Sequence, residues 1–219
     1  IFFNCSQIDN PTQENAVVDR PGIPLNKLDV FNLNEVPSMT LEFSLSDWNT
    51  ILQNFDLNPA NDEKVVSKFS YLNRSGSVTL DSIGVRLRGN TSRRRPEGSF
   101  GELHSVTNPD WHHSHFALDF SQFRDDQRFA GLEKLNIKWF KDDAAYVREI
   151  YCYDLFRRFG CWNAPRASYC RVNIKVQSDP SPAYFGVYEM VESIDKDFIE
   201  KNQSKWGSGV GFLWKGGYS

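Results

Sequence analysis

The segment 142–160, DDAAYVREIYCYDLFRRFG, has the clearest helical pattern of the chain, and segments with the alternation of strands flank it on both sides. Its apolar residues recur every four positions, at Val147, Tyr151, Leu155 and Phe159. Acidic residues begin the segment, arginines end it and a glycine follows, as is typical of a complete helix. One long helix among strands excludes an all-helical fold.

The other regular segments alternate apolar and polar residues, which predicts strands. They are residues 39–46, 64–72, 78–89, 115–120, 132–140, 167–176 and 183–192. Shorter helical patterns occur at 46–55, where Ser46 is the expected N-cap, and at 196–203. This order predicts an α+β fold, in which one antiparallel sheet has one long helix packed across it.

Composition narrows the functional classes. The 219 residues are 40% hydrophobic and include 17 Phe, 8 Tyr and 6 Trp, which suits a globular, strand-rich chain with an aromatic core or a ligand cleft. The net charge of −3 argues against general binding to nucleic acid. The sequence contains no run of 18 apolar residues, so it predicts no transmembrane segment.

Residues 1–37 are polar and rich in proline, which predicts a lead-in or linker before a domain that begins at residue 38. Near its start, Cys5 follows the apolar residues Ile1-Phe2-Phe3. Two interpretations stay open: Cys5 is the lipid-modified anchor of a secreted lipoprotein, or the segment is an ordinary stretch at the cut end of a longer protein.

Basic residues concentrate in the stretch GVRLRGNTSRRR, residues 84–95, which holds five arginines within ten residues. Strand alternation places Arg86 and Arg88 on one face, at the point where the strand ends and a long loop begins. With Lys138 on a neighbouring strand they could form an anion site, because guanidinium groups bind phosphate and carboxylate in pairs. The alternative is a solvated sheet face with a basic loop.

Charged residues on the predicted helix and on the last strand are further candidates. The helical period places Arg148 within the apolar stripe and Glu149 well away from it, so we expect Arg148 to point inward and to need a partner. Glu189 and Glu192 lie near the end of the strand 183–192. Either this strand end is exposed, or one of the two acids pairs with Arg148 or with a bound cation.

Histidines cluster in the run Trp111-His112-His113-Ser114-His115. On a strand only His113 and His115 could converge, and no motif such as HExxH accompanies them. Metal binding and an ordinary strand both stay open, and we assign no metal ligand in this chain.

Seven motifs occur in one order, and together they resemble the CotH family, the spore-coat protein H kinases. The motifs are VRLRGNTS, FALDF, LEKLNIKW, AYVREIYCYDLFRRFG, APRASYCRVNI, YFGVYEMVESIDKDFIEK and GFLWK. The resemblance covers about residues 38–216. It implies an atypical protein-kinase fold that transfers the γ-phosphoryl group of ATP to serine residues of partner proteins, with Mg²⁺ or another divalent metal. It also implies a protein of the bacterial cell envelope or a secreted protein.

By this resemblance, residues 38–191 correspond to the amino-terminal lobe, and residues 192–219 to the hinge and the start of a truncated second lobe. The catalytic residues are expected beyond residue 219, so the segment by itself is expected to be inactive. The family's regulatory helix implies that Glu149 pairs with a phosphate-binding lysine. The implied residues for nucleotide and phosphate binding are Arg86, Arg88, Asn90, Lys138, Arg148, Glu149 and Glu192.

One departure from the family pattern concerns the nucleotide. The family usually has lysines where this chain has His112 and His113, so either Lys138 or Arg88 takes their role or nucleotide binding is weak. Two functions follow. The favoured one is an ATP-dependent serine kinase, of which this chain is the nucleotide-covering half. The alternative is a non-catalytic surface module that binds a glycan or an acidic partner.

Overall fold

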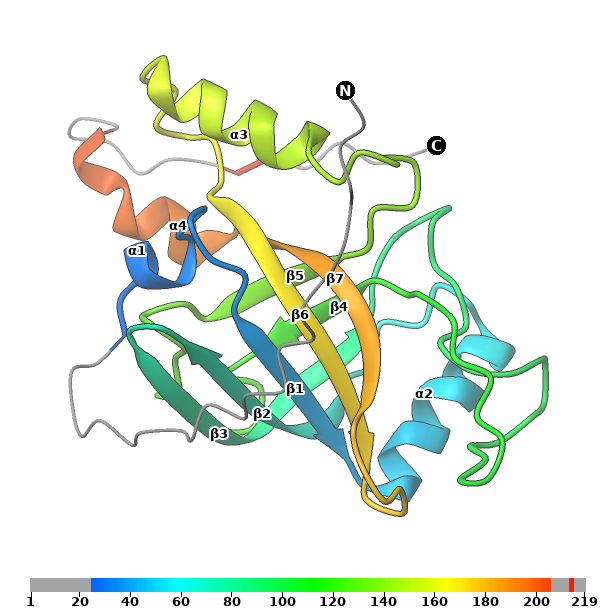
Figure 1. Ribbon diagram of the computed structural model, residues 1–219. Helices are drawn as coiled ribbons and strands as arrows, with labels where there is room; N and C mark the ends of the chain where they lie inside the picture. Colours follow the sequence, from blue (N-terminus) through cyan, green and yellow to red (C-terminus); the bar gives the residue numbers. More distant parts are fainter. Residues whose placement is uncertain (1–24, 206–212, 215–219) are drawn as a thin grey trace, which may run out of the picture.

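Strands β1 (Ser38–Phe43) and β6 (Ala167–Val176) pair in parallel, and this pairing closes a barrel of seven strands (Figure 1). The computed structural model describes residues 25–205 and 213–214. The other strands are β2 (Val65–Asn73), β3 (Gly76–Leu87), β4 (Phe116–Asp119), β5 (Lys134–Lys138) and β7 (Ala183–Glu192). Around the barrel the order is β1-β2-β3-β4-β5-β7-β6, and every pair except β1 with β6 is antiparallel.

Short helices surround the barrel. They are α1 (Lys27–Val30), α2 (Leu45–Leu57), α3 (Arg148–Arg158), α4 (Lys196–Lys201) and the 3-10 turn η1 (Gln203–Lys205). Figure 1 shows α3 across the top of the molecule and α2 at the lower right. None of the helices in the described ranges is long and apolar enough to cross a membrane.

The barrel interior is filled by the apolar residues that alternate along each strand. Met39, Leu41 and Phe43 of β1 are all fully buried. Rings of Phe69 and Phe129 meet edge to face, with centroids 4.9 Å apart. The aromatic core expected from the composition therefore lies inside the barrel.

The predicted α+β fold, an antiparallel sheet with one long packed helix, is wrong. The sheet closes on itself because β1, the first strand, reaches β6 and pairs with it in parallel. Alternation within a segment predicts a strand, but it does not encode which distant strand becomes its partner. Two boundaries also differ: β1 ends at Phe43, and Ser44 rather than Ser46 is the N-cap of α2.

Helix α3 is shorter than the predicted helix 142–160, because a turn replaces its first part. The Asp143 carboxylate accepts hydrogen bonds from the backbone N–H groups of Ala145, Val147 and Arg148 at 3.1, 2.8 and 2.6 Å. Tyr146 adopts a left-handed conformation, with φ 56°. These contacts satisfy the backbone without a helix, so α3 begins only at Arg148.

The face that α3 turns toward the barrel also differs from the prediction. Val147, Tyr151 and Phe159 of the expected packing stripe are 43%, 57% and 80% exposed. Instead Ile150 is buried and, with the half-buried Tyr153, packs in a small apolar cluster on the outer surface of β6 and β7. The inward face of α3 is therefore set by side chains outside the apolar stripe.

Part of the predicted lead-in packs on the barrel. Helix α1 has a capping box between Asn26 and Asp29, and Val30 is buried. Lys27 Nζ lies 2.8 Å from an oxygen of Glu192, at the end of β7. Cys5, which is a lipid anchor in one of the two open interpretations, lies outside the described residues.

Candidate functional site

A cavity of about 300 Å³ lies between α3, the end of β5 and the segment that joins them. Its volume is at the lower end of the range of roughly 300–1,000 Å³ for small-molecule sites. The lining residues are Ser92, His115, Lys138, Trp139, Phe140, Lys141, Asp142, Asp143, Arg148, Glu149 and Glu189. Both basic and acidic side chains therefore face one small space.

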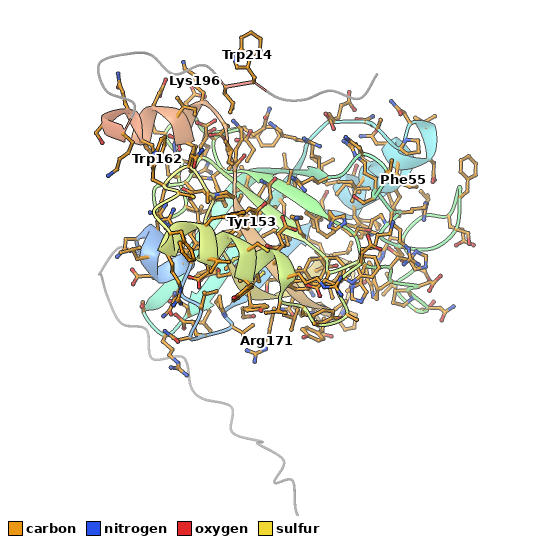
Figure 2. The ribbon with its side chains drawn as sticks, turned by 90° about the horizontal axis from the view of Figure 1, so that it is seen from above. Phe55, Tyr153, Trp162, Arg171, Lys196 and Trp214 are labelled. Atoms are coloured by element: carbon orange, nitrogen blue, oxygen red, sulfur yellow. The ribbon has the colours of Figure 1, made fainter. Side chains whose placement is uncertain are left out.

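An ion pair between Lys138 and Glu149 joins β5 to α3 at this cavity. Lys138 Nζ donates to Glu149 Oε2, and Tyr153 Oη donates to Glu149 Oε1 at 2.9 Å. Tyr153 comes from α3, near the middle of the molecule in the view of Figure 2. Burial raises the pKa of Glu149, but hydrogen bonding and the charge of Lys138, with the bond from Tyr153, outweigh it and lower that pKa. Glu149 is therefore a carboxylate held against a lysine.

Glu189 forms the other side of this cluster. It lies directly opposite Lys138 in the pairing of β5 with β7, and Lys138 Nζ is 3.7 Å from its Oε2. The Glu189 side chain is only 2% exposed. Burial and then the charge of Glu149 raise the pKa of Glu189 to about 8, although Lys138 opposes the shift. Glu189 therefore carries a proton at neutral pH, next to an ionised Glu149.

His115 contributes an uncharged donor. Its Nδ1 accepts a hydrogen bond from the backbone N–H of Trp139 at 2.9 Å, so in the neutral ring the proton is on Nε2. Burial, followed by the charges of Arg88 and Lys138, lowers the pKa of His115 to about 4. This cavity-lining side chain is therefore neutral, and its Nε2–H can donate to an anion.

His113 and His115 do converge, but on an aromatic ring. The His113 ring stacks on Trp139 with centroids 5.1 Å apart, and the His115 ring is 6.4 Å from the same ring. Within the described part of the chain, no three or more His, Cys, Asp or Glu residues are grouped so that they could hold a metal ion.

The family model described as CotH kinase protein matches residues 85–211, which is more than half of the chain. The chain belongs to the CotH kinase protein family. The match confirms the resemblance seen in the ordered motifs, and it includes every residue that lines the cavity. No curated protein and no solved structure matches the chain.

In this CotH protein the basic residues of the stretch 84–95 do not all reach the cavity. Arg86 forms an ion pair with Asp62 at 2.7 Å, and Arg93 contacts the same carboxylate. Arg95 is buried against Asp56, with Nε and Oδ1 2.9 Å apart. Arg93 therefore fastens the long loop to the segment that follows α2, and Arg95 fastens it to α2 itself. Arg86 joins β3 to that same segment and does not line the cavity.

Arg88 and Asn90 differ from each other in placement. Arg88 is half-buried. Its charge adds to the effect of burial in lowering the pKa of His115, and it opposes the rise that burial and Glu149 cause in the pKa of Tyr153, so Arg88 lies near the cavity wall. Asn90 is exposed and does not line the cavity.

Helix α3 reverses the predicted roles of its first two residues. Arg148, expected to point inward, has a side chain that is 73% exposed and lies 3.6 Å from Asp143 at the cavity rim. Glu149 points inward instead, because Lys138 and Tyr153 bind its two carboxylate oxygens.

Glu192 does not line the cavity. It is buried at the end of β7 and accepts from Lys27 at 2.8 Å and from Arg166 at 3.2 Å. Its contacts tie the chain before β1 and the segment before β6 to the last strand.

Sequence patterns assign no site role to His115, Tyr153 or Ser92. For Glu189 they leave two interpretations open, an exposed strand end and a partnered acid. Alternation placed His115 on a strand and Glu189 near the end of another. What it could not show is the register that sets Glu189 opposite Lys138.

Proposed function

We propose that the cavity binds the phosphates of ATP, and that this chain is the nucleotide-covering half of a CotH-type serine kinase. The Lys138–Glu149 ion pair is the observation that carries this proposal. In protein kinases a lysine on a strand contacts the nucleotide phosphates, and a helix glutamate holds that lysine in place. Here β5 supplies the lysine and α3 supplies the glutamate.

The surrounding charges support an anionic ligand. Lys138, Lys141 and Arg148 line the cavity, and Arg88 lies beside it. The neutral His115 adds a donor without adding a charge. Because Glu189 is protonated at neutral pH, it does not repel a phosphate as a carboxylate would.

In this proposal the residues of the cavity position the nucleotide and neutralise the charge of its phosphates. These two tasks are most of what a protein contributes to phosphoryl transfer. Lys138 binds phosphate oxygens, Glu149 orients Lys138, and Tyr153 orients Glu149. A divalent metal would offset the charge of the phosphates. The described residues include no cluster suited to hold one, so no step is assigned to a metal here. We further propose that the phosphate acceptor is a serine of a partner protein, and that the protein is located at the cell envelope or outside the cell.

The test is binding of Mg-ATP, measured by calorimetry and by thermal shift against Mg²⁺ alone. At about 100 times its dissociation constant, ATP should stabilise the protein by about 2.7 kcal/mol. Lys138→Ala should weaken ATP binding by about tenfold or more, because a charge-assisted contact is lost. Glu149→Gln should weaken it less, because the amide keeps the shape of the carboxylate.

Lys68→Ala is the matched control. Lys68 lies on β2, and its half-exposed side chain is 3.9 Å from Asp81. Its removal should leave ATP affinity unchanged. A wild-type protein without any response to Mg-ATP would contradict the kinase proposal and favour the surface-module alternative.

A further inference from the structure

Glu189 has a carboxyl oxygen for which the described part of the chain offers no hydrogen-bond partner. This atom, Oε1, is buried, although the residue lines the cavity. Buried polar atoms in native proteins are nearly always hydrogen-bonded, so this atom calls for a ligand group or an ordered water. The residue that carries it belongs to the site proposed for the nucleotide.

The neighbours of Glu189 explain why Oε1 is left over. Glu149 takes the two close donors of the cluster, Lys138 and Tyr153. Glu189 is hydrogen-bonded to Glu149 and has a looser contact with the lysine, 3.7 Å from Lys138 Nζ to its Oε2. If Glu189 shares its proton with Glu149 through Oε2, the oxygen near Lys138, then Oε1 is left as an uncharged acceptor.

An uncharged acceptor in this position discriminates between ligand groups. A phosphate oxygen is itself an acceptor, so it cannot satisfy Oε1 unless the carboxyl proton moves. The basic side chains and His115 offer only donors, so they suit the anionic end of a ligand. Asp143 is already occupied by three backbone N–H groups. The cavity therefore combines a donor-rich side with a buried acceptor.

We propose that Glu189 determines ligand specificity, because its Oε1 accepts a hydrogen bond from an amino or hydroxyl group of the bound nucleotide. This inference rests on the proposed function, since it assigns the phosphates to Lys138 and its neighbours. The amino group would come from the base, and the hydroxyl group from the ribose. A site that hydrogen-bonds such a group rejects analogues that lack it.

The experiment measures the affinity of each of four ligands for each of three proteins, by calorimetry at pH 7 with Mg²⁺. The comparison shows whether the loss of a ligand group and the loss of the Glu189 side chain have the same effect. The ligands are ATP, purine riboside triphosphate, which lacks the base amino group, 2′,3′-dideoxyATP, which lacks the ribose hydroxyls, and inorganic tripolyphosphate. The proteins are wild type, Glu189→Leu and Glu189→Gln. The glutamine variant keeps an oxygen acceptor at the same place, and it serves as the test if the leucine variant does not fold.

Wild type should bind ATP about tenfold more tightly than one of the two analogues, and that analogue identifies the donor. Glu189→Leu should lose this preference, whereas Glu189→Gln should keep it. Affinity for tripolyphosphate should be the same in all three proteins.

An equal preference in wild type and Glu189→Leu would overturn the role of Glu189 and assign Oε1 to a water. If wild type bound tripolyphosphate as tightly as ATP, the specificity inference alone would fail. If wild type bound neither, the proposed function would fail with it.

Discussion

At the scale of single residues, the cluster of Lys138, Glu149 and Glu189 shows how burial divides the roles of two similar acids. Glu149 receives two close donors and stays ionised, whereas Glu189 is more deeply buried and keeps its proton. The difference arises from position, because both residues have the same side chain. One acid can then hold the lysine while the other stays neutral beside an anionic ligand.

The raised pKa of Glu189 predicts a specific dependence of stability on pH. The folded protein keeps this proton up to about pH 8, whereas the unfolded chain releases it near the ordinary pKa of 4.5. The stability that this proton contributes is therefore complete below the pKa of the unfolded chain. It is lost as pH rises through the pKa of the folded protein, by at most about 1.4 kcal/mol per pH unit.

Glu189→Gln should remove that dependence, because an amide does not titrate. We expect the free energy of unfolding, measured in urea from pH 5 to 9, to fall less steeply in this variant than in wild type. Parallel profiles for the two proteins would contradict the protonation of Glu189.

At the scale of elements, the buried side chain of one histidine links three parts of the fold. His104, in the long loop, is fully buried between Glu97 and Asp179, with 2.8 Å contacts to each. Trp48 of α2 donates to Glu97 at 2.7 Å, and Asp179 lies in the turn between β6 and β7. The loop, α2 and the turn are therefore held at one point.

Removal of His104 should be costly. His104→Ala removes the cationic partner that Glu97 and Asp179 share, so we expect a loss of about 3–5 kcal/mol in the free energy of unfolding. His112→Ala is the matched control, because that side chain is 22% exposed and should cost under about 1 kcal/mol. Equal losses of unfolding free energy in the two variants would contradict the role of His104 in linking these parts.

The same histidine predicts a loss of stability at high pH. Burial lowers the pKa of His104, but hydrogen bonds with Glu97 and Asp179 outweigh it, so the pKa is raised. Its contribution is complete below the unfolded pKa near 6.5 and is lost as pH rises through the folded pKa. Chemical unfolding at pH 6 and pH 9 should show a smaller decrease in His104→Ala than in wild type, because only the part due to Glu189 remains.

The orientation of α3 has its own test. Ile150→Ala should cost about 2–4 kcal/mol, because Ile150 is buried against the barrel. Tyr151→Gln should change the free energy of unfolding by less than about 0.5 kcal/mol, because Tyr151 is exposed. The opposite order would restore the stripe expected from the sequence as the packing face.

At the scale of the whole molecule, the local sequence pattern predicts the strands and helices, but it does not predict how they assemble. The strand segments follow from alternation that is visible within each segment, and Lys138 and Glu149 were both named as site residues. The closed barrel and the Lys138–Glu189 pairing depend on contacts between distant segments, which no local period encodes. The inward face of α3 depends on contacts that Glu149 and Ile150 make with distant strands, and both residues lie outside its apolar stripe.

The parallel pairing of β1 with β6 also has a consequence for biosynthesis. Ser38 pairs with Arg171, so β1 is synthesised long before the strand with which it pairs in parallel. At about 5–20 residues per second, the wait is on the order of ten seconds. During this interval one edge of β1 is open to pairing with other nascent chains. Aggregation through this edge should therefore be most favourable before β6 emerges and should stop once β6 pairs with β1.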